Sequence, residues 1–275
     1  MSHLPYSAWR DKHLQRHTMS VDGAEVSYWY SQAKSDRKTL LFVHGISGDH
    51  NGLVPLAREF SDTHNIVLIE LPGHGESGRQ ELHTARDLQT WFEHAYDELM
   101  DHTVKIDWII AHSFGCSAVV KTTKAKVILL CPVPSPSGLY RQYARITKQL
   151  APFWALFYSW KAFVWLRGTT LQKVRTRQAS RRIRWAGFQS RASYAQIVYQ
   201  ARLVDIVLDS TAYKNVSSNV ELVICGLEDT TAAERDSAEL EPIFNHSRIE
   251  FLRGGHLLPI ETPGRVAEQI KQILC

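Results

Sequence analysis

Residues 106–118, Ile-Asp-Trp-Ile-Ile-Ala-His-Ser-Phe-Gly-Cys-Ser-Ala, carry the strongest structural signal in this 275-residue chain. An apolar run typical of a strand ends at Ala111, a helix-forming segment begins at Phe114, and Ser113 stands at the bend. Ala111 and Gly115 are small, as a sharp strand-to-helix turn requires, because backbone segments approach closely there. The pattern predicts a nucleophile elbow, in which strained backbone pushes the Ser113 hydroxyl out of the sheet.

Five more short apolar runs flank this segment, and such runs are typical of strands buried on both faces. They span residues 39–43, 66–69, 127–131, 220–225 and 249–252. Helix-forming segments alternate with them, at residues 53–60, 85–100, 114–121, 232–240 and 263–274. This alternation predicts an α/β fold, a mostly parallel central sheet with helices on both faces and a ligand site at the carboxyl ends of its strands. Residues 25–30 alternate in polarity and are expected to form an antiparallel edge with residues 14–20.

The composition excludes several classes of protein. With 44% apolar and 22% charged residues, the chain fits neither a disordered protein nor a membrane bundle. The N-terminal residues carry charges and no apolar signal-peptide core, so a cytoplasmic location is expected. The cysteines are widely spaced and form no CxxC pair, so we expect neither a zinc site nor any other metal; they are Cys116, Cys131, Cys225 and Cys275.

Residues 137–214 differ in composition from the rest of the chain. They carry a net charge of +12, whereas the remainder carries −8, and they hold 14 of the 28 aromatic residues. No strand-like run occurs in this stretch, and residues 152–166 are very apolar. We therefore expect two domains: a core of residues 1–136 and 215–275, and a basic, aromatic-rich helical cap or lid of residues 137–214 that roofs an apolar pocket. The arginine-dense run 173–184 is expected either to face solvent or to form a rim that attracts anions.

Two further loops supply what a serine nucleophile needs. The Gly-rich bend after residue 43 is expected to provide one oxyanion-hole donor, the backbone N–H of Ile46, beside a second from Phe114. A serine hydroxyl also needs a base that is held in one tautomer by a buried carboxylate. The loops after the last two predicted strands offer Glu228 and Asp229 as the acid and His256 as the base.

Taken together, these motifs resemble those of the α/β-hydrolase superfamily. The resemblance runs from about Glu25 to Leu274, with the cap excepted, and rests on five features: His44-Gly45, the turn Leu71-Pro72-Gly73-His74-Gly75-Glu76-Ser77, the elbow at Ser113, Asp229, and Gly255-His256 followed by Glu261 and Pro263. It implies a serine-dependent hydrolase with a cap, in which Ser113 is the nucleophile, Asp229 the triad acid and His256 the base. It also implies a mechanism that needs no cofactor.

The chain departs from the family pattern at two places. Ala111 stands where Gly is commoner, and the link from the elbow to the next predicted strand is short. Some family members carry the acid after the strand that ends near Cys131, but residues 132–137 contain no carboxylate, which favours Asp229.

The expected function is hydrolysis of a carboxylic ester or thioester through an acyl-enzyme, as in carboxylesterases and lipases, with an apolar acyl or aryl group under the cap. Two alternatives stay open: a carbon–carbon bond hydrolase of the same fold, and a non-catalytic small-molecule binding protein. The expected partner is a small ester or thioester, either anionic or amphiphilic. The basic stretch lacks a nucleic-acid motif, so no nucleic acid is expected, whereas the apolar run 150–166 allows transient contact with a membrane surface.

Overall fold

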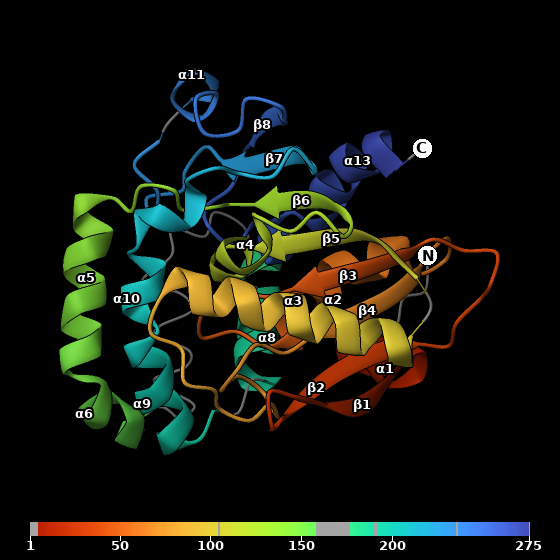
Figure 1. The fold of residues 1–275 in the computed structure, drawn as a ribbon, viewed down its shortest axis with the longest axis horizontal. Coiled ribbons are helices and arrows are strands. Elements are labelled where there is room, and N and C mark those ends of the chain that lie inside the picture. The colour runs from red at the N-terminus through yellow and green to blue at the C-terminus, as the bar shows by residue number, and fades with distance from the viewer. Residues whose placement is uncertain (1–4, 104, 158–176, 190–191, 235, 275) are drawn as a thin grey trace.

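The computed structural model describes residues 5–103, 105–157, 177–189, 192–234 and 236–274. An eight-stranded sheet crosses the molecule in the order β1-β2-β4-β3-β5-β6-β7-β8 (Figure 1). Its strands are β1 (Leu14–Val21), β2 (Ala24–Ser31), β3 (Thr39–Val43), β4 (Asn65–Ile69), β5 (Ile106–His112), β6 (Lys126–Leu130), β7 (Val220–Gly226) and β8 (Arg248–Leu252). The first two strands form the antiparallel edge, β2 pairs antiparallel with β4, and the other neighbours are parallel. The predicted α/β fold is confirmed.

Helices cover both faces of the sheet because the central strands are apolar on both faces. Leu41 and Val43 of β3 pack into one core with α3 (Ala85–His102) and α4 (Phe114–Val119). Leu40 and Phe42 point the other way, into a core shared by the remaining helices of that face. These are α1 (Tyr6–His13), α2 (Val54–Ala57) with the 3₁₀ turn η2 (Arg58–Phe60), α12 (Leu258–Glu261) and α13 (Pro263–Leu274). A further 3₁₀ turn, η1 (His50–Gly52), precedes α2 in the chain.

A group of helices lies between β6 and β7, at the carboxyl end of the sheet (Figure 1). Its described elements are α5 (Gly138–Gln149), α6 (Ala151–Phe157), α8 (Arg177–Gln189), α9 (Tyr194–Arg202), α10 (Val204–Val207) and η3 (Ser210–Tyr213). The run 152–166 therefore begins in α6, but its part from residue 158 onward lies outside the described residues, as does the start of the arginine-dense run at residues 173–176. No helix among the described residues is long and apolar enough to cross a membrane.

Two predicted helices differ from the structure. Among the described residues of the stretch 232–240, only α11 (Ser237–Leu240) is helical, because the Asp236 side chain accepts a hydrogen bond from the Glu239 N–H and so starts the helix there. Just before it, Ala232 bridges to Pro136 as a β-strand would. The predicted helix 53–60 is divided between α2 and η2.

Candidate active site

Ser113 occupies the turn between β5 and α4 in a strained backbone conformation. Its φ of 53° and ψ of −116° lie where side-chain-bearing residues are rare. The Ser113 N–H donates to the Leu130 carbonyl at 2.9 Å, which ties the turn to β6. A Cβ on Gly115 would lie 2.6 Å from the His44 oxygen and 2.8 Å from the Val43 oxygen, so only glycine fits beneath the turn. The geometry is that of the predicted elbow.

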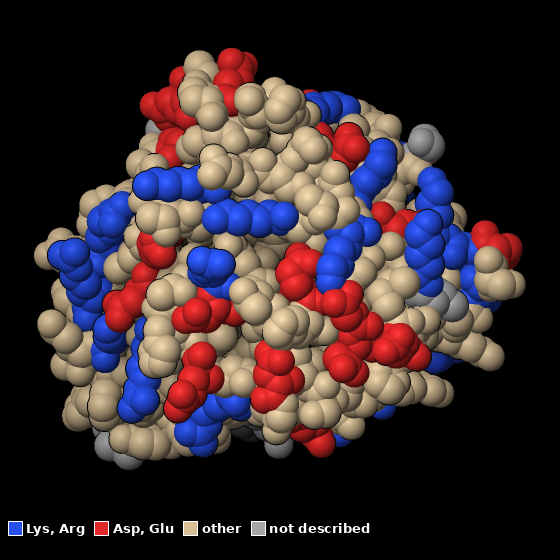
Figure 2. Space-filling model, in the orientation of Figure 1, with Lys and Arg blue, Asp and Glu red and all other residues tan. Residues whose placement is uncertain are grey.

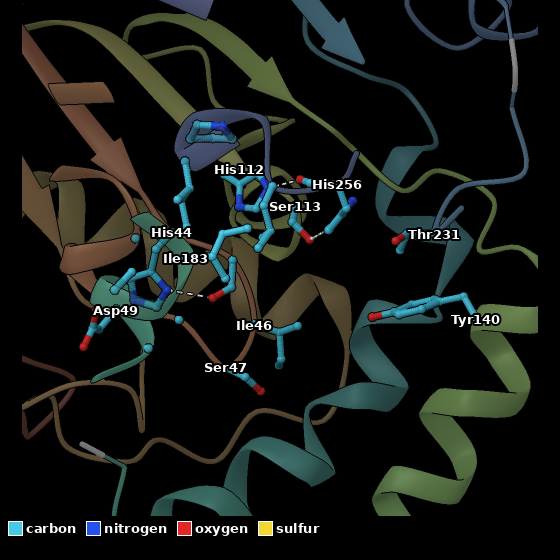
Figure 3. Close-up of a pocket in the computed structure, with 18 of the residues that line it drawn as sticks. His44, Ile46, Ser47, Asp49, His112, Ser113, Tyr140, Ile183, Thr231 and His256 are labelled. Atoms are coloured by element: carbon cyan, nitrogen blue, oxygen red, sulfur yellow. Dashed lines mark hydrogen bonds between the residues drawn. The ribbon is translucent and has the colours of Figure 1, made fainter. Parts of the chain in front are cut away.

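Ser113, His256 and Asp229 form a continuous chain of hydrogen bonds. The Ser113 hydroxyl lies 2.7 Å from His256 Nε2 (Figure 3). Asp229 Oδ2 lies 2.7 Å from His256 Nδ1. A carboxylate only accepts, so Nδ1 carries a proton and a neutral His256 leaves Nε2 free to accept the serine proton. Burial lowers the pKa of His256, but the charge and hydrogen bond of Asp229 outweigh burial and raise it above its usual 6.5.

Asp229, rather than Glu228, is the carboxylate that faces His256. It lies buried after β7, and its second oxygen accepts the Thr231 N–H at 2.8 Å. Burial raises its pKa, but the neighbouring His256 and these hydrogen bonds hold that pKa below its usual range. The Glu228 carboxylate instead accepts the Gly254 N–H and so supports the loop that carries His256.

Ile46 lies in a loop that two buried histidines hold in place. His44 donates from Nδ1 to the Gly45 carbonyl at 2.8 Å, and its Nε2 accepts the Leu71 N–H at 3.1 Å. His74 donates from Nδ1 to Pro72 at 2.9 Å, and its Nε2 accepts the Ser47 N–H at 3.1 Å.

Burial lowers the pKa of His44 well below its usual value and that of His74 to about 4, so both rings are neutral. Each can therefore donate from one nitrogen and accept at the other. The sequence analysis assigned no function to either histidine, although both lie in motifs. The structure shows that they join the loop at residues 44–47 to the turn at residues 71–74.

The pocket in front of Ser113 has a volume of about 560 Å³ and extends to both sides of the serine. In Figure 3, Tyr140 of α5 and Thr231 lie on one side, and Ile183 of α8 and Asp49 lie on the other. Besides Tyr140, α5 contributes Leu139, Tyr143, Ala144 and Thr147 to the lining. Besides Ile183, α8 contributes Ala186 and Gly187, and the lining residues Leu257 and Ile260 pack with Ile183 and Ala186.

The sequence profile described as "Alpha/beta hydrolase family" matches residues 40–269, which is most of the chain. The chain belongs to this family. This α/β-hydrolase is also 28% identical over 126 residues to a Haemophilus influenzae protein provisionally named an esterase/lipase. That match covers 45% of this chain and 41% of the relative, so the chain spans less than half the length of that relative.

Solved structures share the fold. A provisionally named lipase of Acinetobacter baumannii superposes with a TM-score of 0.71 at 17% identity, over 100% of this chain and 97% of the other. The enol-lactonase of Burkholderia xenovorans superposes with a TM-score of 0.72 at 17% identity, over 94% of this chain and 99% of the other. At these identities the likeness establishes the fold alone.

The charges of this α/β-hydrolase are unevenly distributed. In Figure 2, Lys and Arg gather over the end of the molecule that holds α5, while Asp and Glu are common over α3 and α11. Among the described residues that line the pocket, none is Lys or Arg. Arg182 of the arginine-dense run donates to Tyr6 Oη and to the Glu261 carbonyl, both at 3.0 Å, and so ties α8 to α1 and α12.

Two side-chain groups in the described part of the chain are close enough to share a metal ion. Cys131, Asp229 and His256 form one of them, and its two triad candidates already bond to each other. In the second group, His50 donates to Glu70 at 2.6 Å, Glu70 also accepts the Glu76 N–H at 2.7 Å, and Asp49 accepts the Asn51 N–H at 2.9 Å. The buried Nε2 of His50 has no hydrogen-bond partner among the described residues.

The described cysteines are free thiols. Cys116, Cys131 and Cys225 form no disulfide, and Cys275 lies outside the described residues. Cys116 is fully buried, its thiol donates to the Ala111 carbonyl at 3.3 Å, and burial raises its pKa. A buried thiol of this kind is a poor nucleophile, so its proximity to Ser113 in the sequence reflects packing.

Proposed function

We propose that this α/β-hydrolase is a serine hydrolase that cleaves a carboxylic ester or thioester through an acyl-enzyme. The observation that carries the proposal is the chain of two 2.7 Å hydrogen bonds from Ser113 through His256 to Asp229. The Ser113 end of these hydrogen bonds faces a pocket large enough for a small organic ester. The esterase/lipase relative supports the same reaction class.

In the proposed mechanism, Ser113 attacks the carbonyl carbon while His256 Nε2 takes its proton. The backbone N–H groups of Ile46 and Phe114 hold the tetrahedral oxyanion. Protonated His256 then gives its proton to the leaving group, and an acyl-serine forms. Water attacks the acyl-serine with the help of His256, which releases the acid and regenerates the hydroxyl. Asp229 keeps the imidazole in the required tautomer and stabilises its charged form.

The lining of the pocket favours an uncharged group on each side of the ester bond. The second side is mostly aliphatic, through Ile183, Leu257 and Ile260, and suits an apolar acyl or aryl group. Among the described residues, no Lys or Arg lines the pocket. A preference for anionic or amphiphilic esters would therefore arise from the basic outer surface, which raises the rate at which anions encounter the protein.

The division of the chain is part of the proposal. We assign residues 1–136 and 215–275 to the catalytic core and residues 137–214 to a cap, because α5 and α8 supply pocket walls from within this segment. The cytoplasmic location expected from the sequence stays a prediction.

Contact with a membrane surface is supported by an exposed apolar stripe on α5. Leu139, Tyr143, Ile146 and Leu150 share one face of the helix and are 72%, 43%, 47% and 42% exposed. Co-sedimentation with phospholipid vesicles tests this contact. We expect Ile146→Ser with Leu150→Ser to weaken sedimentation, and Leu227→Ser, at an apolar residue 59% exposed elsewhere, to leave it unchanged.

The proposed reaction is tested by turnover of p-nitrophenyl esters. We expect wild-type activity that persists with EDTA and falls about 10⁴-fold or more in Ser113→Ala and in His256→Ala. Wild-type turnover in Ser113→Ala would contradict the proposal. If the protein is a carbon–carbon bond hydrolase, the wild type hydrolyses a diketone acid but not the esters, and the same two substitutions abolish that hydrolysis. If it is a binding protein, the wild type turns over neither substrate.

A further inference from the structure

We propose that His112 is a positioning residue, which fixes the active-site histidine by holding the main-chain carbonyl of His256. The inference rests on the proposed role of His256 as the base. His112 is the last residue of β5, next to Ser113, and its Nε2 lies 2.7 Å from the His256 carbonyl oxygen (Figure 3). The two rings lie 5.2 Å apart between centroids.

The loop that carries His256 needs anchors because two glycines precede the histidine. Gly254 has a φ of 149°, a conformation that side-chain-bearing residues rarely adopt. The N–H groups of this loop are held by carboxylates: Glu261 accepts those of Gly255 at 3.0 Å and Leu257 at 3.3 Å. These bonds restrain the N–H groups on either side of His256, and the bond from His112 restrains its carbonyl.

The chemistry of His112 suits a permanent donor. The residue is buried, at 7% exposure, and burial with the nearby His256 lowers its pKa to about 3. The ring is therefore neutral and carries one proton. A carbonyl oxygen only accepts, so that proton is on Nε2 and the bond to His256 is present throughout the working pH range.

The other edge of the ring faces the loop that holds Ile46. A Cβ on Gly45 would lie 3.1 Å from His112 Nδ1 and 3.0 Å from the Ser113 Cβ, so the ring and this loop are in close contact. One imidazole thus lies against the elbow, the loop of the proposed oxyanion hole and the loop of the proposed base. Loss of its N–H would remove the restraint on the His256 carbonyl and leave only the N–H groups of the loop held, and a displacement of about 1 Å can cost about 10²-fold in rate.

Paired substitutions separate positioning from packing. His112→Leu fills similar space without a donor, whereas His112→Gln places an amide N–H near the position of Nε2. His13→Leu is the matched control, because His13 Nδ1 also donates to a main-chain carbonyl, that of Trp9 at 2.8 Å, and His13 is not among the described pocket residues. For each variant the experiment measures kcat, KM, Tm and the low-field proton resonance of the His256–Asp229 hydrogen bond.

We expect His112→Leu to lower kcat about 10²-fold with KM nearly unchanged and to move or broaden the low-field resonance. His112→Gln should recover most of both, and His13→Leu should lower Tm without changing either. The proposal is overturned if His112→Leu keeps wild-type kcat and resonance, or if His112→Gln is no better than His112→Leu. The resonance needs no substrate, so absence of ester turnover in the wild type would refute the proposed function while leaving this readout intact.

Discussion

At the residue scale, the sharp turn at Ser113 depends on the small residues packed around it as much as on the serine itself. Gly115 is the clearest case, because two main-chain oxygens lie within 2.8 Å of where its Cβ would be. Main-chain atoms of a buried strand cannot move aside as a flexible side chain can.

Gly115→Ala should therefore destabilise the fold and misplace Ser113 together. We expect a loss of about 1–3 kcal/mol in the free energy of unfolding, measured by urea denaturation, and a fall in kcat. Gly264→Ala is the control, since nothing lies within 4 Å of a Cβ there. Equal stability of the two variants would show that the elbow is less tightly packed than the distances indicate.

Asp229 controls the pH at which His256 works. The acid limb of kcat/KM reports protonation of the base, and Asp229 raises the pKa of His256, so activity should fall as the pH drops through a value above 6.5. Asp229→Asn removes this cause, so the residual activity should have its acid limb at lower pH. Glu228→Gln, whose parent carboxylate holds the Gly254 N–H, should keep the wild-type limb. A limb that moves in Glu228→Gln and stays in Asp229→Asn would reverse the assignment.

At the element scale, strands were more predictable than helices. Each of the six short apolar runs predicted as strands is a strand within one or two residues of its predicted bounds, because burial on both faces leaves a continuous signal. Helix 232–240 was predicted from composition, but Ala233 donates instead to Ser135 in a loop far away in the sequence. Contacts of this range, like that of His112 with His256, leave no local pattern to read.

Arg182 helps attach α8 to the core, beside the apolar contacts of Ile183 and Ala186 with Ile260. Arg182 bonds to residues of α1 and α12, and this structural role differs from both alternatives expected for the run, a solvent-facing surface and an anion-attracting rim. We expect Arg182→Gln to lower the free energy of unfolding by about 1–3 kcal/mol, as loss of hydrogen bonds from a charged group does. The adjacent exposed Arg181, changed to Gln, is the control. If both variants unfold at the same denaturant concentration, α8 is held by its apolar contacts alone.

At the scale of the whole molecule, buried neutral histidines make stability depend on pH. His44, His74 and His112 all have pKa values below the usual 6.5, with His74 at about 4 and His112 at about 3. Below pH 6.5 the unfolded chain binds protons that the folded chain does not, so stability falls as the pH decreases. Each histidine contributes up to about 1.4 kcal/mol per pH unit within its window.

His74→Gln should flatten this dependence. We expect a smaller difference in the free energy of unfolding between about pH 6.5 and about pH 5 than in the wild type, because one proton fewer is taken up on unfolding. His246→Gln, at an exposed position, should keep the wild-type difference. Identical pH dependence in all three proteins would show that His74 is protonated in the folded state.

The central claim, that Ser113 is the nucleophile of this molecule, is tested most directly by a fluorophosphonate probe. The probe reacts with an activated serine, and tryptic digestion places Ser113 in the peptide of residues 106–121, between Lys105 and Lys121. We predict that mass spectrometry finds the adduct in this peptide, on Ser113, and that Ser113→Ala is not labelled. Absence of labelling in the folded wild type, or an adduct on another residue that persists in Ser113→Ala, would contradict the account.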